Sequence, residues 1–118
     1  MSIFEDTAPR ASRRRPLRIA VLGASGSIGT QTLDVCRKHS DKIKVVALSV
    51  RRSTNFLVSA AREFGVTHVA VTEDEHANDS VMEDLPAGCE VHSGYDSIVD
   101  LACLDEVVCV VSAVVGFA

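Results

Sequence analysis

The sequence predicts an α/β domain built on a doubly wound, mainly parallel sheet with helices on both faces. From Leu17 onward, short β-branched runs alternate with segments whose apolar residues recur at helical spacing, which is the pattern of consecutive βαβ units. Three glycines separate the first apolar run from the first helical segment, as expected where a buried strand turns into a helix. The 118 residues suffice for one domain. We expect residues 1–16 to form a disordered basic leader and residues 17–118 to form the domain.

Five apolar runs predict the strands, because each is short, β-branched and bounded by turn residues. These runs are residues 17–23, 42–50, 67–72, 89–94 and 106–116. We expect their spatial order to begin 3-2-1-4, because a ligand-binding turn after the first strand should lie where the strand order reverses.

Apolar residues at helical spacing predict two longer helices. The first is expected to bury Ile28, Thr32, Val35 and Cys36, and the second Leu57, Ala60, Ala61 and Phe64. Gly65 should end the second helix, because glycine readily adopts the left-handed conformation found at helix C-termini. Residues 73–84 are polar and acidic with a moderately helical pattern, and residues 95–101 carry a weaker one.

Composition and charge exclude several kinds of partner. The net charge of −4 argues against binding to nucleic acid or to an anionic membrane surface. No apolar run approaches the roughly 20 residues that span a bilayer. The four cysteines are scattered, so we expect reduced, mostly buried thiols in a cytoplasmic protein. The four histidines are equally dispersed, so we expect no metal site, and the acidic residues 73–79 should form a solvated surface.

The stretch GASGSIG, residues 23–29, has its glycines at equal three-residue intervals. After a parallel strand, the first glycine permits a tight turn, the second lets a ligand approach the backbone, and the third removes a side chain where the helix packs. Unpaired N–H groups at the start of the helix favour an anion. The residues predicted to bind the phosphates of a dinucleotide, in a Rossmann-like fold, are Ser25, Gly26, Ser27 and Ile28. A glycine-rich turn without a ligand is the open alternative, whereas a Walker loop is excluded because no Lys–Ser or Lys–Thr pair closes the stretch.

Basic residues follow the second predicted strand, where NAD-preferring sites usually carry an acid for the ribose 2′-hydroxyl. No acidic residue occurs between Lys44 and Arg62, and the strand instead ends in Arg51, Arg52 and Ser53. A pair of guanidinium groups suits a dianionic 2′-phosphate. We therefore predict NADPH as the cofactor, with two solvated surface arginines as the alternative.

Two segments resemble a known family. LGASGSIGTQTLDVCRKHSDKIKVVALSV, residues 22–50, resembles the first βαβ unit of the 1-deoxy-D-xylulose 5-phosphate reductoisomerase family, and VVSAVVGFA, residues 110–118, resembles its segment just before the metal and substrate residues. The resemblance implies that residues 25–28 form the pyrophosphate-binding turn and that residues 51–53 lie near the adenosine 2′-phosphate. In place of residues 51–53, the family more usually has a Gly–Lys–Asn type of loop.

The resemblance also implies an activity. Members of the family use NADPH and a divalent metal, magnesium or manganese, to isomerise and reduce 1-deoxy-D-xylulose 5-phosphate to 2-C-methyl-D-erythritol 4-phosphate in non-mevalonate isoprenoid synthesis. Their chains are several hundred residues long, and their metal ligands and sugar-phosphate site lie beyond the part matched here. We therefore expect an NADPH-binding domain of a larger, homodimeric enzyme that is inactive by itself. The alternatives are another NADP-dependent reductase with this glycine spacing, of the aspartate-semialdehyde dehydrogenase type, and a dinucleotide-sensing regulatory module.

Overall fold

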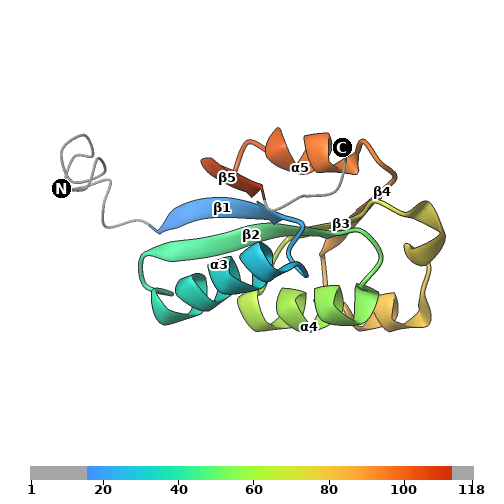
Figure 1. Ribbon diagram of the computed structural model, residues 1–118, viewed down its shortest axis with the longest axis horizontal. Coiled ribbons are helices and arrows are strands. Elements are labelled where there is room, and N and C mark those ends of the chain that lie inside the picture. The colour runs from blue at the N-terminus through green and yellow to red at the C-terminus, as the bar shows by residue number, and fades with distance from the viewer. Residues whose placement is uncertain (1–15, 113–118) are drawn as a thin grey trace.

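In the computed structural model, which describes residues 16–112, the chain folds around a five-stranded sheet (Figure 1). The strands are β1 (Leu17–Leu22), β2 (Ile43–Val50), β3 (His68–Val71), β4 (Glu90–Ser93) and β5 (Cys109–Ser112). All neighbouring strands pair in parallel, which confirms the predicted sheet. The predicted leader falls outside the described residues except for Pro16, and so does the end of the predicted fifth strand.

Helices cover both faces of the sheet, as predicted (Figure 1). α3 (Ser27–Lys38) and α4 (Thr54–Phe64) lie on one face, and α5 (Ser97–Ala102) lies on the other. Two 3-10 helices, η1 (Asp74–His76) and η2 (Ser80–Asp84), occupy the acidic segment that the sequence marked as moderately helical. Met82 is the buried residue of these two turns, and Ala77, Val81 and Leu85 pack partly buried against the same core.

The strands lie in the order β4-β3-β2-β1-β5. The last position of the predicted order, 3-2-1-4, is therefore wrong, because β5 rather than β4 lies beside β1. The short connection through η1 and η2 returns the chain to the edge formed by β3, where β4 pairs. α5 then packs across the opposite face and brings β5 to β1. The strand order reverses at β1, so the predicted switch point is confirmed.

The core has two unequal parts, one on each face of the sheet. The larger lies between the sheet and the face formed by α3, α4 and η2, and the smaller lies beneath α5. Along β1, Ile19 and Val21 belong to the larger part, whereas Ala20 and Leu22 belong to the smaller. β1 is therefore buried on both sides, which explains its continuous apolar run.

The buried face of α3 differs from the predicted one. Gly29, Leu33 and Cys36 face the core, whereas Ile28 and Val35 are 54% and 51% exposed. A β-carbon on Gly29 would lie only 2.4 Å from the carbonyl oxygen of Gly23. Gly29 therefore lies directly against the turn, and this contact rotates α3 so that Ile28 and Val35 point outward.

α4 follows the prediction closely. Leu57, Ala60 and Ala61 are buried, and Phe64 packs against the core. Gly65 ends the helix with φ of +65°, and its N–H donates to the carbonyl oxygen of Ala61. A left-handed residue at this point lets the chain leave the helix without strain.

The four cysteines are free thiols, but they are not mostly buried, so that prediction is wrong. Only Cys36 is buried, because it lies on the inner face of α3; Cys89 and Cys109 are half-buried and Cys103 is exposed. Burial raises the pKa of the Cys36 and Cys89 thiols. Within residues 16–112, no helix has the length and apolar character needed to cross a bilayer.

Candidate dinucleotide site

The glycine turn follows β1 directly and is fixed to the end of β2. Gly23 has φ of +73°, a conformation that glycine adopts without strain. Its N–H donates to the hydroxyl oxygen of Ser49 at 2.9 Å, and the N–H of Ala24 donates to the carbonyl oxygen of Ser49 at 2.8 Å. Ser49 is 1% exposed. One buried serine therefore satisfies two backbone donors and holds the turn in place.

The other two glycines differ in the space around them. A β-carbon on Gly29 would lie 2.4 Å from the Gly23 oxygen and 2.6 Å from the Ala24 oxygen, so no side chain fits there. At Gly26 the nearest atom would be 3.6 Å away, which is an ordinary contact, and φ is −77°. Neither the backbone conformation nor the packing requires glycine at position 26. The absence of a side chain at Gly26 leaves the backbone accessible to a ligand from solvent.

The start of α3 is open to an anion. Gly26 is the N-cap residue and offers no side-chain oxygen, and no acidic residue lies in the first turn. Ser27 and Ile28 are exposed and Ser25 is half-buried. The first N–H groups of a helix lack intrahelical partners and lie at the positive end of its dipole. The N–H of Gly26 already donates to the Gly23 carbonyl oxygen at 3.2 Å. The groups of residues 25–28 that can donate to a phosphate are therefore the N–H groups of Ser27 and Ile28 and the hydroxyls of Ser25 and Ser27.

Arg51, Arg52 and Ser53 are exposed and form the bend between β2 and α4. Val21 of β1 pairs with Leu48 of β2 in parallel register, so both strands end at the same edge of the sheet. The glycine turn and this basic bend therefore lie at the same edge, as the sequence predicted. Ser53 is the N-cap residue of α4, and its carbonyl oxygen accepts from the N–H of Leu57.

The two arginines have different surroundings. Arg51 donates from Nε to Glu73 Oε2 at 2.5 Å, and the N–H of Glu73 donates to the Arg51 carbonyl oxygen at 2.9 Å. Arg52 has no acidic side chain within 4 Å in the part of the chain that the structure describes. Arg52 is thus available to an external anion, and Arg51 is already oriented by a carboxylate.

Two residues at this edge had no predicted role. The sequence predicts only that Ser49 is part of a strand and that Glu73 is part of a solvated acidic surface. Their contacts depend on strand register: Val21 pairs with Leu48, and Val50 pairs with Val71. The one sequence signal for a role of Ser49 is that it is a polar residue near the end of an apolar run. The acidic residues 74 and 75 are exposed as expected, whereas Glu73 is half-buried.

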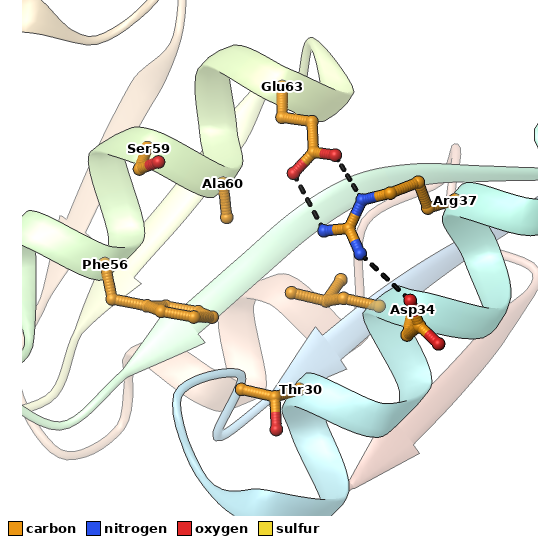
Figure 2. A pocket seen from close by; sticks show the side chains of 8 residues that line it. Thr30, Asp34, Arg37, Phe56, Ser59, Ala60 and Glu63 are labelled. Carbon is orange, nitrogen blue, oxygen red and sulfur yellow. Dashed lines mark hydrogen bonds and ion pairs between the residues drawn. The ribbon is translucent and has the colours of Figure 1, made fainter.

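A cleft of about 350 Å³ lies between α3 and α4, away from the basic bend (Figure 2). Arg37 pairs there with both carboxylate oxygens of Glu63 and with Asp34 at 3.3 Å. Hydrogen bonding to Arg37 lowers the pKa of Glu63, and hydrogen bonding to Lys38 lowers the pKa of Asp34. The Arg37 cation is thus already matched by protein acids, so this cleft is a poor site for a phosphate.

A histidine pair lies on the α5 face of the sheet. His68 Nε2 lies 2.8 Å from Glu106 Oε1, and His68 Nδ1 lies 3.2 Å from His92 Nε2. His68 is the first residue of β3, at the amino end of that strand, and His92 is the third residue of β4. Across residues 16–112, no group of three or more histidine, cysteine or acidic side chains could hold a metal ion.

Comparison with known proteins identifies relatives of this arrangement. Residues 19–118 match the family model of 1-deoxy-D-xylulose 5-phosphate reductoisomerase. The reductoisomerase of Clostridium perfringens is 38% identical over 101 residues, which cover 84% of this chain. That of Agathobacter rectalis is 39% identical over 99 residues. The chain spans only 26% of the length of each relative.

Solved structures agree in fold. The Zymomonas mobilis reductoisomerase in complex with NADPH superposes with a TM-score of 0.71 at 31% identity, covering 78% of this chain and 24% of that one. A DOX-P reductoisomerase in complex with NADPH, fosmidomycin and magnesium gives a TM-score of 0.74 at 28% identity, covering 85% and 25%. The sheet, the glycine turn and the matched residues lead to one assignment: the chain belongs to the 1-deoxy-D-xylulose 5-phosphate reductoisomerase family.

Proposed function

We propose that residues 17–118 form the NADPH-binding domain of a reductoisomerase that converts 1-deoxy-D-xylulose 5-phosphate to 2-C-methyl-D-erythritol 4-phosphate. The observation that carries this proposal is the joint position of two donor surfaces. The open first turn of α3 and the basic bend after β2 lie at one edge of the sheet, beside its switch point. The family match argues against the alternative reductase of the aspartate-semialdehyde dehydrogenase type.

The residues present fit NADPH. Residues 25–28 would hold the pyrophosphate through the N–H groups of Ser27 and Ile28 and the hydroxyls of Ser25 and Ser27, and the missing side chain at Gly26 lets the pyrophosphate reach the backbone. Arg51, Arg52 and Ser53 would hold the 2′-phosphate, with Arg52 available in full and Arg51 oriented by Glu73. When bound, NADPH supplies a hydride. The role of these protein groups is to fix the position of the adenosine end of the cofactor.

The residues present do not fit the divalent metal of the proposed reaction. Three or more suitable ligands do not come together anywhere in residues 16–112, so no step of the chemistry can be assigned to them. Magnesium or manganese and the sugar phosphate would bind to other parts of the full-length enzyme. We therefore expect no turnover when this chain is mixed with NADPH, either metal and the ketose phosphate, followed by the absorbance of NADPH.

Two further features belong to the full-length protein. We expect it to be a homodimer in the cytoplasm that handles small molecules and no nucleic acid. Sedimentation of the full-length protein would check the dimer. The net charge of −4 supports the expectation about nucleic acid, and the four free thiols are compatible with a reducing compartment.

Cofactor preference provides the test. Titration of the chain with NADPH and with NADH, followed by cofactor fluorescence, should give tighter binding of NADPH. The double substitution R51A/R52A should remove most of this preference, about 1–3 kcal/mol for hydrogen bonds to charged groups. R62A is the control, because Arg62 is an exposed arginine in the last turn of α4, at the end of the helix opposite the basic bend. Equal binding of both cofactors by the unsubstituted chain would contradict the proposal.

A further inference from the structure

The segment after β3 is attached to the basic bend at two points. At the first, Glu73 and Arg51 are joined by their side chains and by a backbone hydrogen bond of 2.9 Å. At the second, Thr54 Oγ1 donates to Asp79 Oδ2 at 2.7 Å, and His76 Nδ1 lies 3.1 Å from the same oxygen. The bend of residues 51–53 is thus held at each end by one neighbouring segment.

The contact at Glu73 leaves the cation usable. Arg51 contacts the carboxylate through Nε, and a guanidinium group carries four further N–H donors on its two terminal nitrogens. The Arg51 side chain is 76% exposed, whereas that of Glu73 is 25% exposed. Glu73 is the less mobile residue of the pair, because its backbone N–H donates to the Arg51 carbonyl oxygen. Arg51 is therefore positioned from behind while most of its surface faces solvent.

From this geometry we propose that Glu73 is a positioning residue that determines selectivity for a nucleotide carrying a 2′-phosphate. The inference rests on the proposed function. Glu73 restricts the guanidinium group of Arg51 to an orientation in which its terminal donors can form a second, bidentate contact with a phosphate. A long, exposed arginine would otherwise sample many rotamers and lose that freedom on binding.

The negative charge of Glu73 also acts on the phosphate, in the opposite direction. This repulsion is reduced because the Arg51 cation partly neutralises the carboxylate and is itself largely exposed to water, whose high dielectric constant screens the two anions. The orientation of Arg51 acts on a direct hydrogen bond and is not screened in this way. Positioning therefore outweighs repulsion, and loss of Glu73 weakens binding of the phosphorylated nucleotide.

The test compares the nucleotide affinities of five variants of the chain: E73A, E73Q, E75A, R51A and R51A/E73A. E73A should bind NADPH about three- to tenfold more weakly, which corresponds to losing part of one charge-assisted contact, and should bind NADH as before. E73Q should bind NADPH more tightly than E73A, because an amide oxygen also accepts from Nε. E75A is the matched control, because Glu75 is an exposed acid on η1 and its loss changes the net charge equally. In an R51A background, E73A should have no further effect.

Each of the following results would overturn the inference. E73A could bind NADPH more tightly, which would make Glu73 a competitor of the phosphate. It could weaken NADPH and NADH equally, which would indicate a general effect on folding. The E73A substitution could also weaken NADPH binding as much in the R51A background as in the parent chain. If the unsubstituted chain binds NADPH and NADH equally, the proposed function is overturned as well. If the unsubstituted chain prefers NADPH and E73A keeps this preference, only the inference about Glu73 is overturned.

Discussion

Gly23, Gly26 and Gly29 share one spacing in the sequence, but each has different surroundings in the folded turn. Gly23 has the positive φ, and Gly29 has no room for a β-carbon. Gly26 has ordinary dihedral angles and ordinary contacts. Two of the three glycines are thus explained by the fold itself. Under the proposed function, Gly26 allows a ligand to approach the backbone.

This difference predicts opposite behaviour of two alanine variants. G29A should destabilise the domain by about 1–3 kcal/mol, because an overpacked position forces the backbone to move. G26A should cost no more than about 1 kcal/mol, the usual loss at a helix N-cap. G26A should nevertheless weaken NADPH binding at least about tenfold, which corresponds to 1.4 kcal/mol. Thermal unfolding by circular dichroism and nucleotide titration measure the two effects.

The glycine at position 26 would lose its assigned role if G26A bound NADPH as tightly as the unsubstituted chain. The close packing of Gly29 against the turn would likewise be contradicted if G29A unfolded at the same temperature as the unsubstituted chain. G29A adds only one methyl group, so a normal stability would mean that the turn and α3 can separate without cost.

At the scale of elements, the connection between β3 and β4 packs on the core through Val81, Met82 and Leu85 and is also attached to α4 by polar contacts. Asp79 accepts a hydrogen bond from Thr54 at the start of α4. This bond, together with the neighbouring His76, lowers the pKa of the Asp79 carboxyl below its ordinary value of 3.8. The charged form of Asp79 therefore stabilises the attachment of η1 and η2 to α4.

The lowered pKa predicts how the D79A variant depends on pH. Because the folded value lies below the unfolded one, the stabilisation by Asp79 is complete above about pH 5 and is lost as the pH falls through the folded pKa. The difference in unfolding free energy between the parent chain and D79A should thus be constant near neutrality and should shrink in acid. Urea unfolding at several pH values measures it. D84A, which removes an exposed acid of η2, is the control and should show no such trend; a difference that grows in acid would refute the assignment.

Local sequence patterns were sufficient for most elements and insufficient for contacts between them. β1, β2 and α4 follow from β-branched runs, helical spacing and Gly65, all of which are local signals. The face of α3 could not be obtained this way, because Gly29 sets its rotation through contact with the turn. The roles of Ser49 and Glu73 depend on which residues of β1, β2 and β3 are paired. Register and strand order are non-local, so periodicity does not reveal them.

At the scale of the whole molecule, the order β4-β3-β2-β1-β5 places the ends of β1 and β2 at the reversal point of the sheet. α3 and α4 begin at that edge and run back over one face, whereas α5 crosses the other face (Figure 1). Both helices that begin at this edge direct their positive ends toward it. The fold thus concentrates positive potential where the basic bend also lies, although the chain as a whole is acidic.

The position of the cofactor on this edge can be measured directly by amide chemical shifts of the ¹⁵N-labelled chain during titration with NADPH and NADH. The amide signals of residues 25–28 should shift with both nucleotides, because both carry the pyrophosphate. Signals of residues 51–53 should shift strongly with NADPH and weakly with NADH, because only NADPH has the 2′-phosphate. Shifts concentrated at Ser59 and Glu63 in the cleft between α3 and α4, with residues 25–28 unchanged, would contradict the proposed site.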